Sequence, residues 1–149
     1  MNNISGYWKN KRVFITGNTG FKGTWMTILL LELGANIKGF SLGVEDQSLF
    51  KKVSKDLQNK IKNVKGDIRD YELLKKEISS FRPEVIIHLA AQPLVIDSYK
   101  NPMETWDTNL MGTLNLLNAM THNQFTGVAL IITTDKVYWN DNSNKEFNE

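Results

Sequence analysis

The stretch from Arg12 to Gly23, RVFITGNTGFKG, most constrains how this chain can fold. Residues 13–16 resemble a short apolar strand, three glycines follow at G-x-x-G-x-x-G spacing, and residues 24–33 favour a helix. Glycines at that place let the backbone turn sharply and approach a ligand, and the helix N-terminus behind them offers N–H groups to a pyrophosphate. Because the commoner spacing is G-x-G-x-x-G, two interpretations stay open: a dinucleotide-binding turn, or a turn that only packs strand on helix.

The rest of the chain alternates strand-like and helix-like segments. Further strands are expected at residues 36–41, 61–65, 85–89 and 128–133, and further helices at 71–81 and 105–121. Asp70 is placed to cap the first of these helices, and residues 43–60 form a polar excursion with one helical turn around 49–53. Because several strands are apolar throughout, the pattern favours an α/β fold, a Rossmann-type doubly wound parallel sheet. The polar tail after Thr133 predicts a sheet that is incomplete at its C-terminal end.

Length, charge and composition narrow the class further. The 149 residues suit a single domain. The net charge of +2 is too small to indicate a nucleic-acid or anionic-membrane partner. The chain has no cysteine, which excludes disulfides and thiolate metal sites. Its longest apolar run, Ile28 to Leu31, is far below the roughly 20 residues that span a bilayer. A soluble, cytoplasmic protein is therefore expected.

Three groups of polar residues follow expected strands, at the carboxyl ends where such sheets bind ligands. In GDIRD, Asp67 can meet an adenine edge or cap a helix, and both interpretations stay open. In HLAAQP, His88 stands between apolar residues and is interpreted as a buried, hydrogen-bonded histidine rather than a base. The other histidine is distant in sequence, so no metal site is expected. In TTDK, Thr134, Asp135 and Lys136 form either an acid–base cluster or an ordinary polar turn.

Taken together, these motifs carry a resemblance to a known family. Between Asn10 and Tyr138 the chain contains ITGNTGFKG, GDIRD, HLAAQP, DSYKNPMETWDTNLMGTLNLL and ITTDKVY. In their order and spacing it resembles the extended short-chain dehydrogenase/reductases that act on nucleotide sugars. Within them it looks like the CDP-glucose 4,6-dehydratases, because the related dTDP-glucose dehydratases usually carry Asp-Glu where this chain has Asp135 and Lys136.

The resemblance implies a reaction and a set of roles. NAD takes hydride from C4 of the hexose, water leaves across C5 and C6, and the hydride returns to C6 to give the 4-keto-6-deoxy sugar. Thr134 is implied to hydrogen-bond the C4 hydroxyl, Asp135 to protonate the departing C6 hydroxyl, and Lys136 to assist at C5 and C6. The implied cofactor-binding residues are Gly17, Thr19, Gly20, Phe21, Lys22 and Gly23 around the pyrophosphate, Ser41 at the adenosine ribose, Asp67 and Ile68 beside the adenine, Leu89, Ala90 and Ala91 beside the ribose and nicotinamide, and Asn109 in support of the pocket.

The chain departs from the family pattern at two points. The catalytic Tyr-x-x-x-Lys pair expected after Lys136 is absent, since Tyr138 is followed four residues later by Asn142. Residues 1–149 are therefore expected to be an NAD(P)-binding Rossmann domain that stops before that pair and before the substrate domain. At the end of the second strand, Ser41 replaces the acidic residue that grips the ribose hydroxyls. No arginine stands ready for a 2′-phosphate, so NAD is favoured over NADP.

The leading hypothesis is the cofactor-binding part of a CDP-glucose 4,6-dehydratase-like lyase in deoxysugar and polysaccharide biosynthesis, inactive by itself. Two alternatives stay open: another nucleotide-sugar epimerase or reductase of the superfamily, or a non-catalytic Rossmann binding module. The helix expected at 105–121 carries a wide apolar stripe, made of Trp106, Leu110, Leu114 and Leu117 and extended sideways by Leu116 and Met120. Because exposed apolar patches tend to find partners, a homo-oligomer through this helix is expected.

Overall fold

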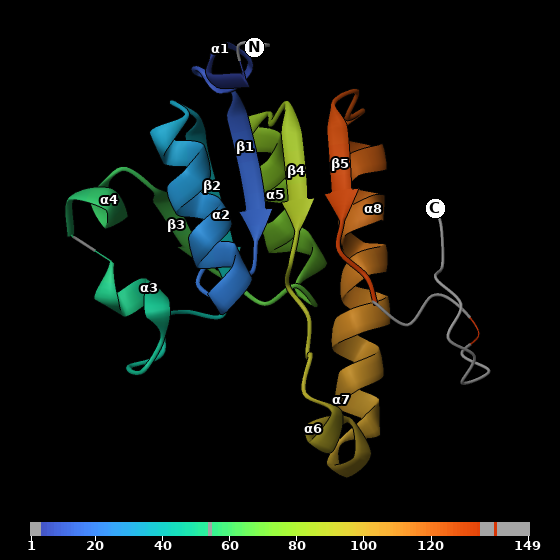
Figure 1. Cartoon of the computed structure of the whole chain (residues 1–149). Coiled ribbons are helices and arrows are strands. Elements are labelled where there is room, and N and C mark those ends of the chain that lie inside the picture. The colour runs from blue at the N-terminus through green and yellow to red at the C-terminus, as the bar shows by residue number, and fades with distance from the viewer. Residues whose placement is uncertain (1–3, 54, 135–138, 140–149) are drawn as a thin grey trace.

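A single parallel sheet organises the structure, a computed structural model that describes residues 4–53, 55–134 and 139. Its strands are β1 (Arg12–Thr16), β2 (Asn36–Ser41), β3 (Lys62–Lys65), β4 (Val85–His88) and β5 (Val128–Ile131). Their order is β3-β2-β1-β4-β5 (Figure 1), which matches the first five strands of the Rossmann arrangement. The doubly wound α/β fold predicted from the alternation is confirmed.

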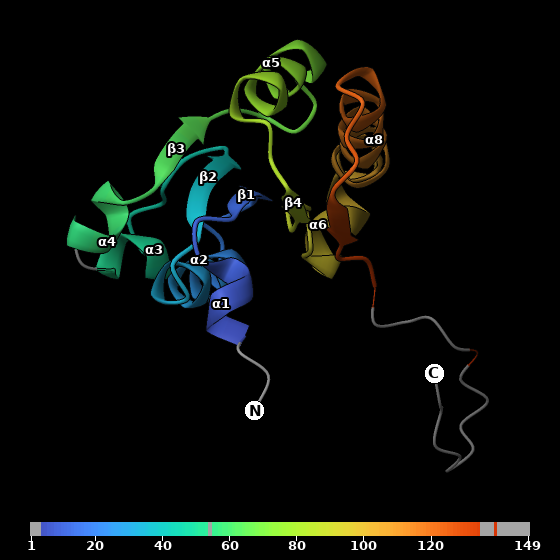
Figure 2. The same ribbon diagram turned by 90° about the horizontal axis from the view of Figure 1, so that it is seen from above.

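Helices cover both faces of this sheet. One face carries α2 (Phe21–Glu32) with the short α3 (Leu49–Lys52), and the other carries α5 (Tyr71–Phe81) packed against α8 (Gly112–His122). Figure 2 shows the sheet between the two layers. The shorter helices are α1 (Ile4–Trp8), α4 (Lys55–Asn59), α6 (Val95–Lys100) and α7 (Pro102–Trp106). In the part of the chain that the structure describes, no helix has the length and hydropathy needed to cross a membrane.

Two apolar cores result from the alternation of side chains along the strands. Val13 and Ile15 of β1 point into the core beneath α2, whereas Phe14 points into the core beneath α5 and α8 together with Phe40 and Ile86. All five side chains are fully buried, and each contributes roughly 1.5–3 kcal/mol by leaving water. An uninterrupted apolar strand is therefore what a sheet covered on both faces requires.

α5 begins and ends where the sequence predicts. The Asp70 side chain accepts a hydrogen bond of 3.0 Å from the N–H of Leu73, which satisfies one of the unpaired donors at the helix start. Arg82 closes the helix in the left-handed conformation, with φ 50° and its N–H bonded to the Ile78 carbonyl. Pro83 follows and cannot continue the helix. The predicted helix and its cap are both confirmed.

The long helix before β5 differs from the one predicted at 105–121. It runs from Pro102 to His122 and consists of α7, a π-helical turn η1 (Asp107–Met111) and α8. A Cβ at Gly112, the first residue after the π turn, would lie 2.5 Å from Cγ2 of Ile68. Glycine there lets α8 pack closely against the segment that follows β3. π turns of this kind are frequent at functional sites.

Other boundaries also depart from the sequence expectation. The helices α1, α4 and α6 lie where no helix was predicted, and α2 begins at Phe21 rather than at 24. The last two strands end earlier than expected, at His88 and Ile131. Where β4 ends, the N–H of Leu89 is shared between the carbonyl and the hydroxyl oxygen of Thr16, at 3.1 and 3.2 Å. The chain then leaves the sheet as a loop.

β5 is poorly covered, and of its residues only Ile131 packs against a core cluster. Val128 and Leu130 pair in register with Val85 and Ile87, which are buried beneath α2. Yet Val128 and Leu130 are 59% and 46% exposed. Figure 1 shows α8 behind β5, and among the described residues no helix in front of it. An apolar strip of the sheet therefore lies open on the α2 side.

Candidate functional site

The chain leaves the sheet in opposite directions after its two central strands. β1 continues through α2 to β2, whereas β4 continues through α6, α7 and α8 to β5 on the other side of the sheet. Open α/β sheets bind ligands at such a switch point, in the crevice outside the carboxyl ends of the strands. The glycine turn after β1 and the loop after β4 both lie at this edge of the sheet (Figure 1).

Two of the three glycines in the turn are required by the backbone itself. Gly17 has φ 70°, and a Cβ there would lie 2.8 Å from the backbone N of Ala90. A Cβ on Gly23 would lie 2.1 Å from the Gly17 carbonyl oxygen. Gly20 differs, because its φ of −69° suits any residue and an added Cβ meets only the Gly17 carbonyl oxygen, at 3.3 Å. A side chain at 20 would therefore enter the space in front of α2 rather than the core.

The N-terminus of α2 is open to an anion. Gly20 is its N-cap, no side chain caps it, and no acidic residue stands in its first turn, where Lys22 is exposed. Unpaired N–H groups and the helix dipole give such an end a partial positive charge. The Thr19 hydroxyl donates a hydrogen bond of 2.7 Å to the Gly43 carbonyl, which ties the turn to the loop after β2. Phe21 projects outward and is exposed.

The segments after β2 and β3 lie along the same edge. Ser41 is the last residue of β2 and pairs in register with Lys65 of β3. The Asp67 carboxylate forms an ion pair of 2.6 Å with Arg69 and also accepts its backbone N–H, so the hydrogen bonds from Arg69 hold the pKa of Asp67 below its ordinary value. The helix cap is Asp70, so Asp67 does not have that role. Ile68 buries its side chain in the core and can offer a ligand only its backbone.

His88 is the centre of a buried hydrogen-bond chain. Its Nδ1 lies 2.6 Å from the Thr16 hydroxyl and its Nε2 lies 3.0 Å from the Thr113 hydroxyl. Thr113 donates its one hydroxyl proton to the Asn109 carbonyl at 2.6 Å, so Nε2 must carry the ring proton and Nδ1 must accept. The ring is 2% exposed, and burial lowers the pKa of His88 to about 4. The predicted buried, hydrogen-bonded histidine is confirmed.

This chain of hydrogen bonds fixes the loop after β4. The Thr16 hydroxyl oxygen also accepts the N–H groups of Leu89 and Ala90, each at 3.2 Å. The Asn109 side chain, in the π turn, accepts the N–H of Gln92 at 2.7 Å and donates to its carbonyl at 3.0 Å. β1, the loop and the long helix are thus joined by polar contacts, and Ala91 is exposed at this edge of the sheet.

The predicted site residues that the structure describes therefore gather at the carboxyl edge of the sheet. Two predicted catalytic residues are not among the described residues. Gly17 to Gly23, Ser41, Asp67 and the loop from Leu89 to Ala91 all follow parallel strands, and Asn109 borders that loop. Thr134 follows β5 and is exposed, whereas Asp135 and Lys136 lie outside the described residues. A cavity of about 850 Å³ lies at the opposite edge, beside Arg82 and Gln124, and none of the predicted site residues lines it.

Sequence reasoning missed several residues that hold the site. Thr16, Thr113 and Gln92 make its connecting hydrogen bonds, and Lys65 stands beside Ser41. A hydroxyl at the end of an otherwise apolar strand marks Thr16 in the sequence, but its partner His88 is far away in the chain. Among the described residues, no cluster of three His, Asp or Glu side chains could hold a metal ion.

Comparison with known proteins assigns the chain to a family. The family model described as GDP-mannose 4,6 dehydratase matches residues 14–149. The chain belongs to the GDP-mannose 4,6-dehydratase family. The resemblance to nucleotide-sugar enzymes of the short-chain dehydrogenase/reductase superfamily, drawn from the glycine turn and the HLAAQP and TTDK segments, is thereby confirmed. The match begins within β1 and includes the other four described strands in full.

Individual relatives share both the sequence and the fold. A CDP-glucose 4,6-dehydratase of Salmonella typhimurium is 45% identical over 135 residues, which are 90% of this chain and 37% of that protein. The chain thus spans well under half of that relative's length. An epimerase of Methanothermobacter thermautotrophicus superimposes with a TM-score of 0.73 at 29% identity, over 87% of this chain and 37% of that one. The Thermus thermophilus UDP-glucose 4-epimerase in complex with NAD gives 0.67 at 29% identity, over 78% and 36%.

Proposed function

We propose that this chain is the cofactor-binding part of a nucleotide-sugar 4,6-dehydratase that acts on CDP-glucose and uses NAD. The carrying observation is the open edge at the switch point, where an uncapped helix end, a glycine turn and a fixed loop converge. The identity to the Salmonella typhimurium CDP-glucose 4,6-dehydratase supports the substrate. The NAD complex of the Thermus thermophilus epimerase supports the cofactor.

The residues at this edge fit a dinucleotide. The exposed N-terminus of α2 suits its pyrophosphate, and Gly20 leaves room for it because no side chain fills the space in front of the helix. The loop from Leu89 to Ala91 offers two alanines and backbone to the ribose and nicotinamide, and Asn109 holds the backbone of the next residue, Gln92. When bound, NAD would accept the hydride from C4 of the hexose and return it to C6.

Three residues after β5 are assigned to the sugar. Thr134 would hydrogen-bond the C4 hydroxyl, and Asp135 would protonate the departing C6 hydroxyl. Lys136 would favour negative charge that develops beside C5 through its ammonium group. These roles are those that the resemblance of the Thr-Asp-Lys sequence to the nucleotide-sugar dehydratases implies. The printed sequence has no Tyr-x-x-x-Lys pair after Lys136, so we expect no 4-keto-6-deoxy product from the 149-residue chain alone.

A nucleotide-sugar epimerase is the second candidate, because both solved structures compared above are epimerases. Thr134, Asp135 and Lys136 separate the two functions. In an enzyme that contains this chain and a Tyr-x-x-x-Lys pair, Asp135→Asn should lower the rate of dehydration about 10²- to 10⁴-fold. Oxidation at C4 should persist, so that the 4-keto intermediate or reduced cofactor accumulates. Full dehydration by the Asp135→Asn variant would remove Asp135 as the acid, and interconversion of C4 epimers without dehydration would establish the epimerase.

Calorimetric titration with NAD⁺ tests the cofactor site in the chain itself. We expect binding in the wild type and its loss in Gly20→Val, whose side chain would fill the place proposed for the pyrophosphate. Thr126→Val is the matched control, because Thr126 is exposed at the opposite edge of the sheet. Thermal melting of both variants checks that the fold is kept. Binding that survives Gly20→Val would exclude the proposed site.

A further inference from the structure

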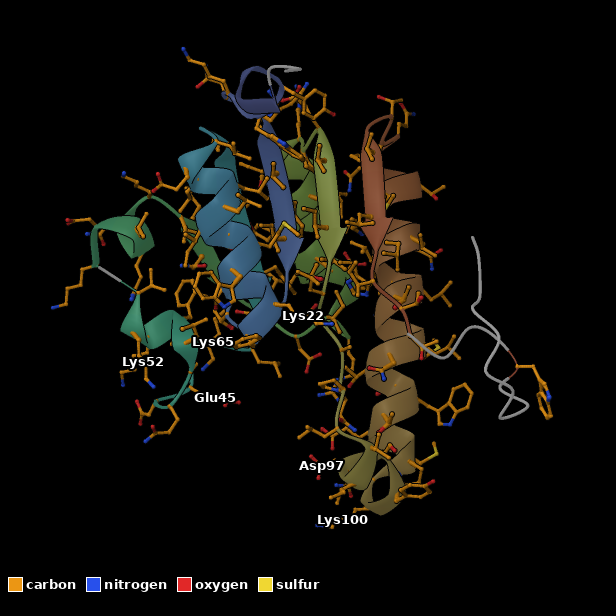
Figure 3. All side chains as sticks on the ribbon, in the orientation of Figure 1. Lys22, Glu45, Lys52, Lys65, Asp97 and Lys100 are labelled. Atoms are coloured by element: carbon orange, nitrogen blue, oxygen red, sulfur yellow. The ribbon has the colours of Figure 1, made fainter. Side chains whose placement is uncertain are left out.

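The cavity of about 850 Å³ opens at the amino edge of the sheet, where β1, β4 and β5 begin. Hydrogen bonds hold its floor, because Glu84 donates its N–H to the Arg12 carbonyl at 2.9 Å and accepts the N–H of Val128 at 3.1 Å. The C-terminal ends of α5 and α8 form its walls. Figure 3 shows Lys22 and Lys65 at the carboxyl ends of the strands, on the far side of the sheet from this cavity. The cavity is therefore separate from the candidate cofactor site.

The lining of the cavity is positively charged. Lys11, Arg12 and Arg82 line it, and Glu84 is the one carboxylate among the described residues that do so. Glu84 pairs with Lys11 at 3.0 Å and with Arg12 at 3.6 Å, whereas the exposed Arg82 has no ion pair with the described residues. Each helix C-terminus adds about half a negative charge. The lining keeps a net positive charge even so, which favours an anionic ligand.

The backbone carries long side chains where glycine is usual. Arg82, at the end of α5, and Gln124, just after α8, both have φ 50° and both line the cavity. This left-handed conformation costs a residue with a side chain roughly 1–2 kcal/mol. Arg12 lies against the first of these positions, because its Nε donates a hydrogen bond of 2.7 Å to the Arg82 carbonyl. The two arginines are thus neighbours in the lining, one of them at a position that strains its backbone.

The remaining lining offers hydrogen bonds more than apolar contact. Its uncharged polar side chains are those of Tyr7, Ser79, Asn123, Gln124 and Thr126. Guanidinium groups bind phosphate through paired N–H donors, and hydroxyl and amide groups bind the hydroxyls of a ligand. The volume is in the range of small-molecule sites. We propose that this cavity binds a small hydroxylated phosphate monoester, the chemical class of the sugar phosphates, with the phosphate on Arg12 and Arg82.

An NMR titration of the ¹⁵N-labelled chain with glucose 6-phosphate tests the site. We expect saturable shifts of the backbone amides of Arg82, Gln124 and Gly127, which lie in or beside the lining. Glucose should leave these signals unchanged, and inorganic phosphate should shift them with weaker affinity. The amides of Gly20 and Lys22 report binding at the N-terminus of α2 instead, so the two edges of the sheet are distinguished in one spectrum.

Variants of Arg82 separate binding from folding. Arg82→Gln should weaken the binding of glucose 6-phosphate about tenfold or more through loss of a charge-assisted hydrogen bond. Arg82→Gly should weaken it as much and yet keep the melting temperature, because glycine suits a φ of 50°. Lys62→Gln is the matched control, because it removes one exposed positive charge from the amino end of β3, outside the lining.

Four results would overturn the proposal. They are the absence of saturable shifts around the cavity, shifts confined to the N-terminus of α2, equal weakening by Lys62→Gln and Arg82→Gln, and inorganic phosphate that binds as tightly as the ester. The third would mean that general positive charge attracts the ligand, and the fourth that the cavity holds a simple anion. None of these results bears on the proposed cofactor site, because the two sites share no residue.

Discussion

Thr16 and His88 are joined by a hydrogen bond of 2.6 Å between the Thr16 hydroxyl and Nδ1 of the imidazole, where β1 and β4 end side by side. The same hydroxyl oxygen accepts the N–H groups of Leu89 and Ala90, so the start of the loop at the candidate site depends on it. This arrangement needs a neutral imidazole, because Nδ1 must accept the hydrogen bond from the Thr16 hydroxyl. The protonation of His88 is therefore linked to the stability of the fold.

The first prediction is a loss of stability as the pH falls from 6.5 towards 4. Above 6.5 the imidazole of His88 is neutral in both states, so it adds no pH dependence. Between 6.5 and about 4 the unfolded chain binds a proton that the folded chain does not, since burial lowers the pKa of His88 to about 4. The loss approaches about 3 kcal/mol at the low end. Urea unfolding at pH 7 to 5 measures most of it, because Asp67 and Glu84, whose pKa values are lowered in the fold, contribute mainly below that interval, where their unfolded forms bind protons.

A pair of histidine variants controls this measurement. His88→Gln should flatten the dependence of the unfolding free energy on pH in that interval. His122→Gln should leave the dependence as it is, because His122 is exposed at the end of α8. An identical slope in the wild type and His88→Gln would show that His88 is not the titrating group.

The second prediction concerns Gly112 and Ile68. Gly112→Ala should destabilise the chain by about 1–3 kcal/mol through overpacking, although alanine normally favours a helix over glycine by about 1 kcal/mol. The reason is the 2.5 Å separation between the added Cβ and Cγ2 of Ile68. In an Ile68→Ala background the same change should be neutral or stabilising. A double-mutant cycle of urea unfolding checks this coupling, and additive effects would contradict it.

The third prediction concerns the cap of α5. Asp70→Ala should lower the free energy of unfolding by about 1 kcal/mol, because the N–H of Leu73 loses its acceptor. Asp70→Asn should retain most of the stability. Asp56→Ala, in the first turn of the exposed α4, is the control and should change stability by less than about 0.5 kcal/mol. Equal effects of the alanine variants at 56 and 70 would point to lost charge rather than a lost cap.

The fourth prediction concerns association through the long helix. Trp106, Leu110, Leu114 and Leu117 are 65%, 54%, 43% and 43% exposed, whereas Leu116 and Met120 turn to the core. The exposed stripe predicts self-association of the chain, which sedimentation over a concentration series measures. Leu117→Glu should shift the chain towards the monomer, while Leu130→Glu, on the open face of β5, should not. A monomer at every concentration would contradict the prediction, and a response to Leu130→Glu alone would assign the contact to β5.

The sequence by itself determined the class of the fold and which edge of the sheet carries the candidate site. Glycine spacing after residue 16, apolar strands and the cap at Asp70 are local properties, so they can be recognised before the chain is folded. They predicted the sheet, the helix of residues 71–81 and the clustering of motifs at one edge. The buried state of His88 followed likewise from the apolar residues around it.

Only the tertiary structure decided which side chains meet. The hydrogen-bond chain through His88 joins three segments, at residues 16, 88 and 113. The contacts of Asn18 join three more, at residues 18, 39 and 63. No local sequence pattern specifies these contacts. Directly after the π turn, Gly112 packs against Ile68 more closely than a Cβ would allow, a contact that helix propensity does not predict. Lys65 in the sequence is one lysine among many, and the parallel register of β2 and β3 is what sets it beside Ser41. Register is a non-local property, because it arises from cores packed on both faces of the sheet.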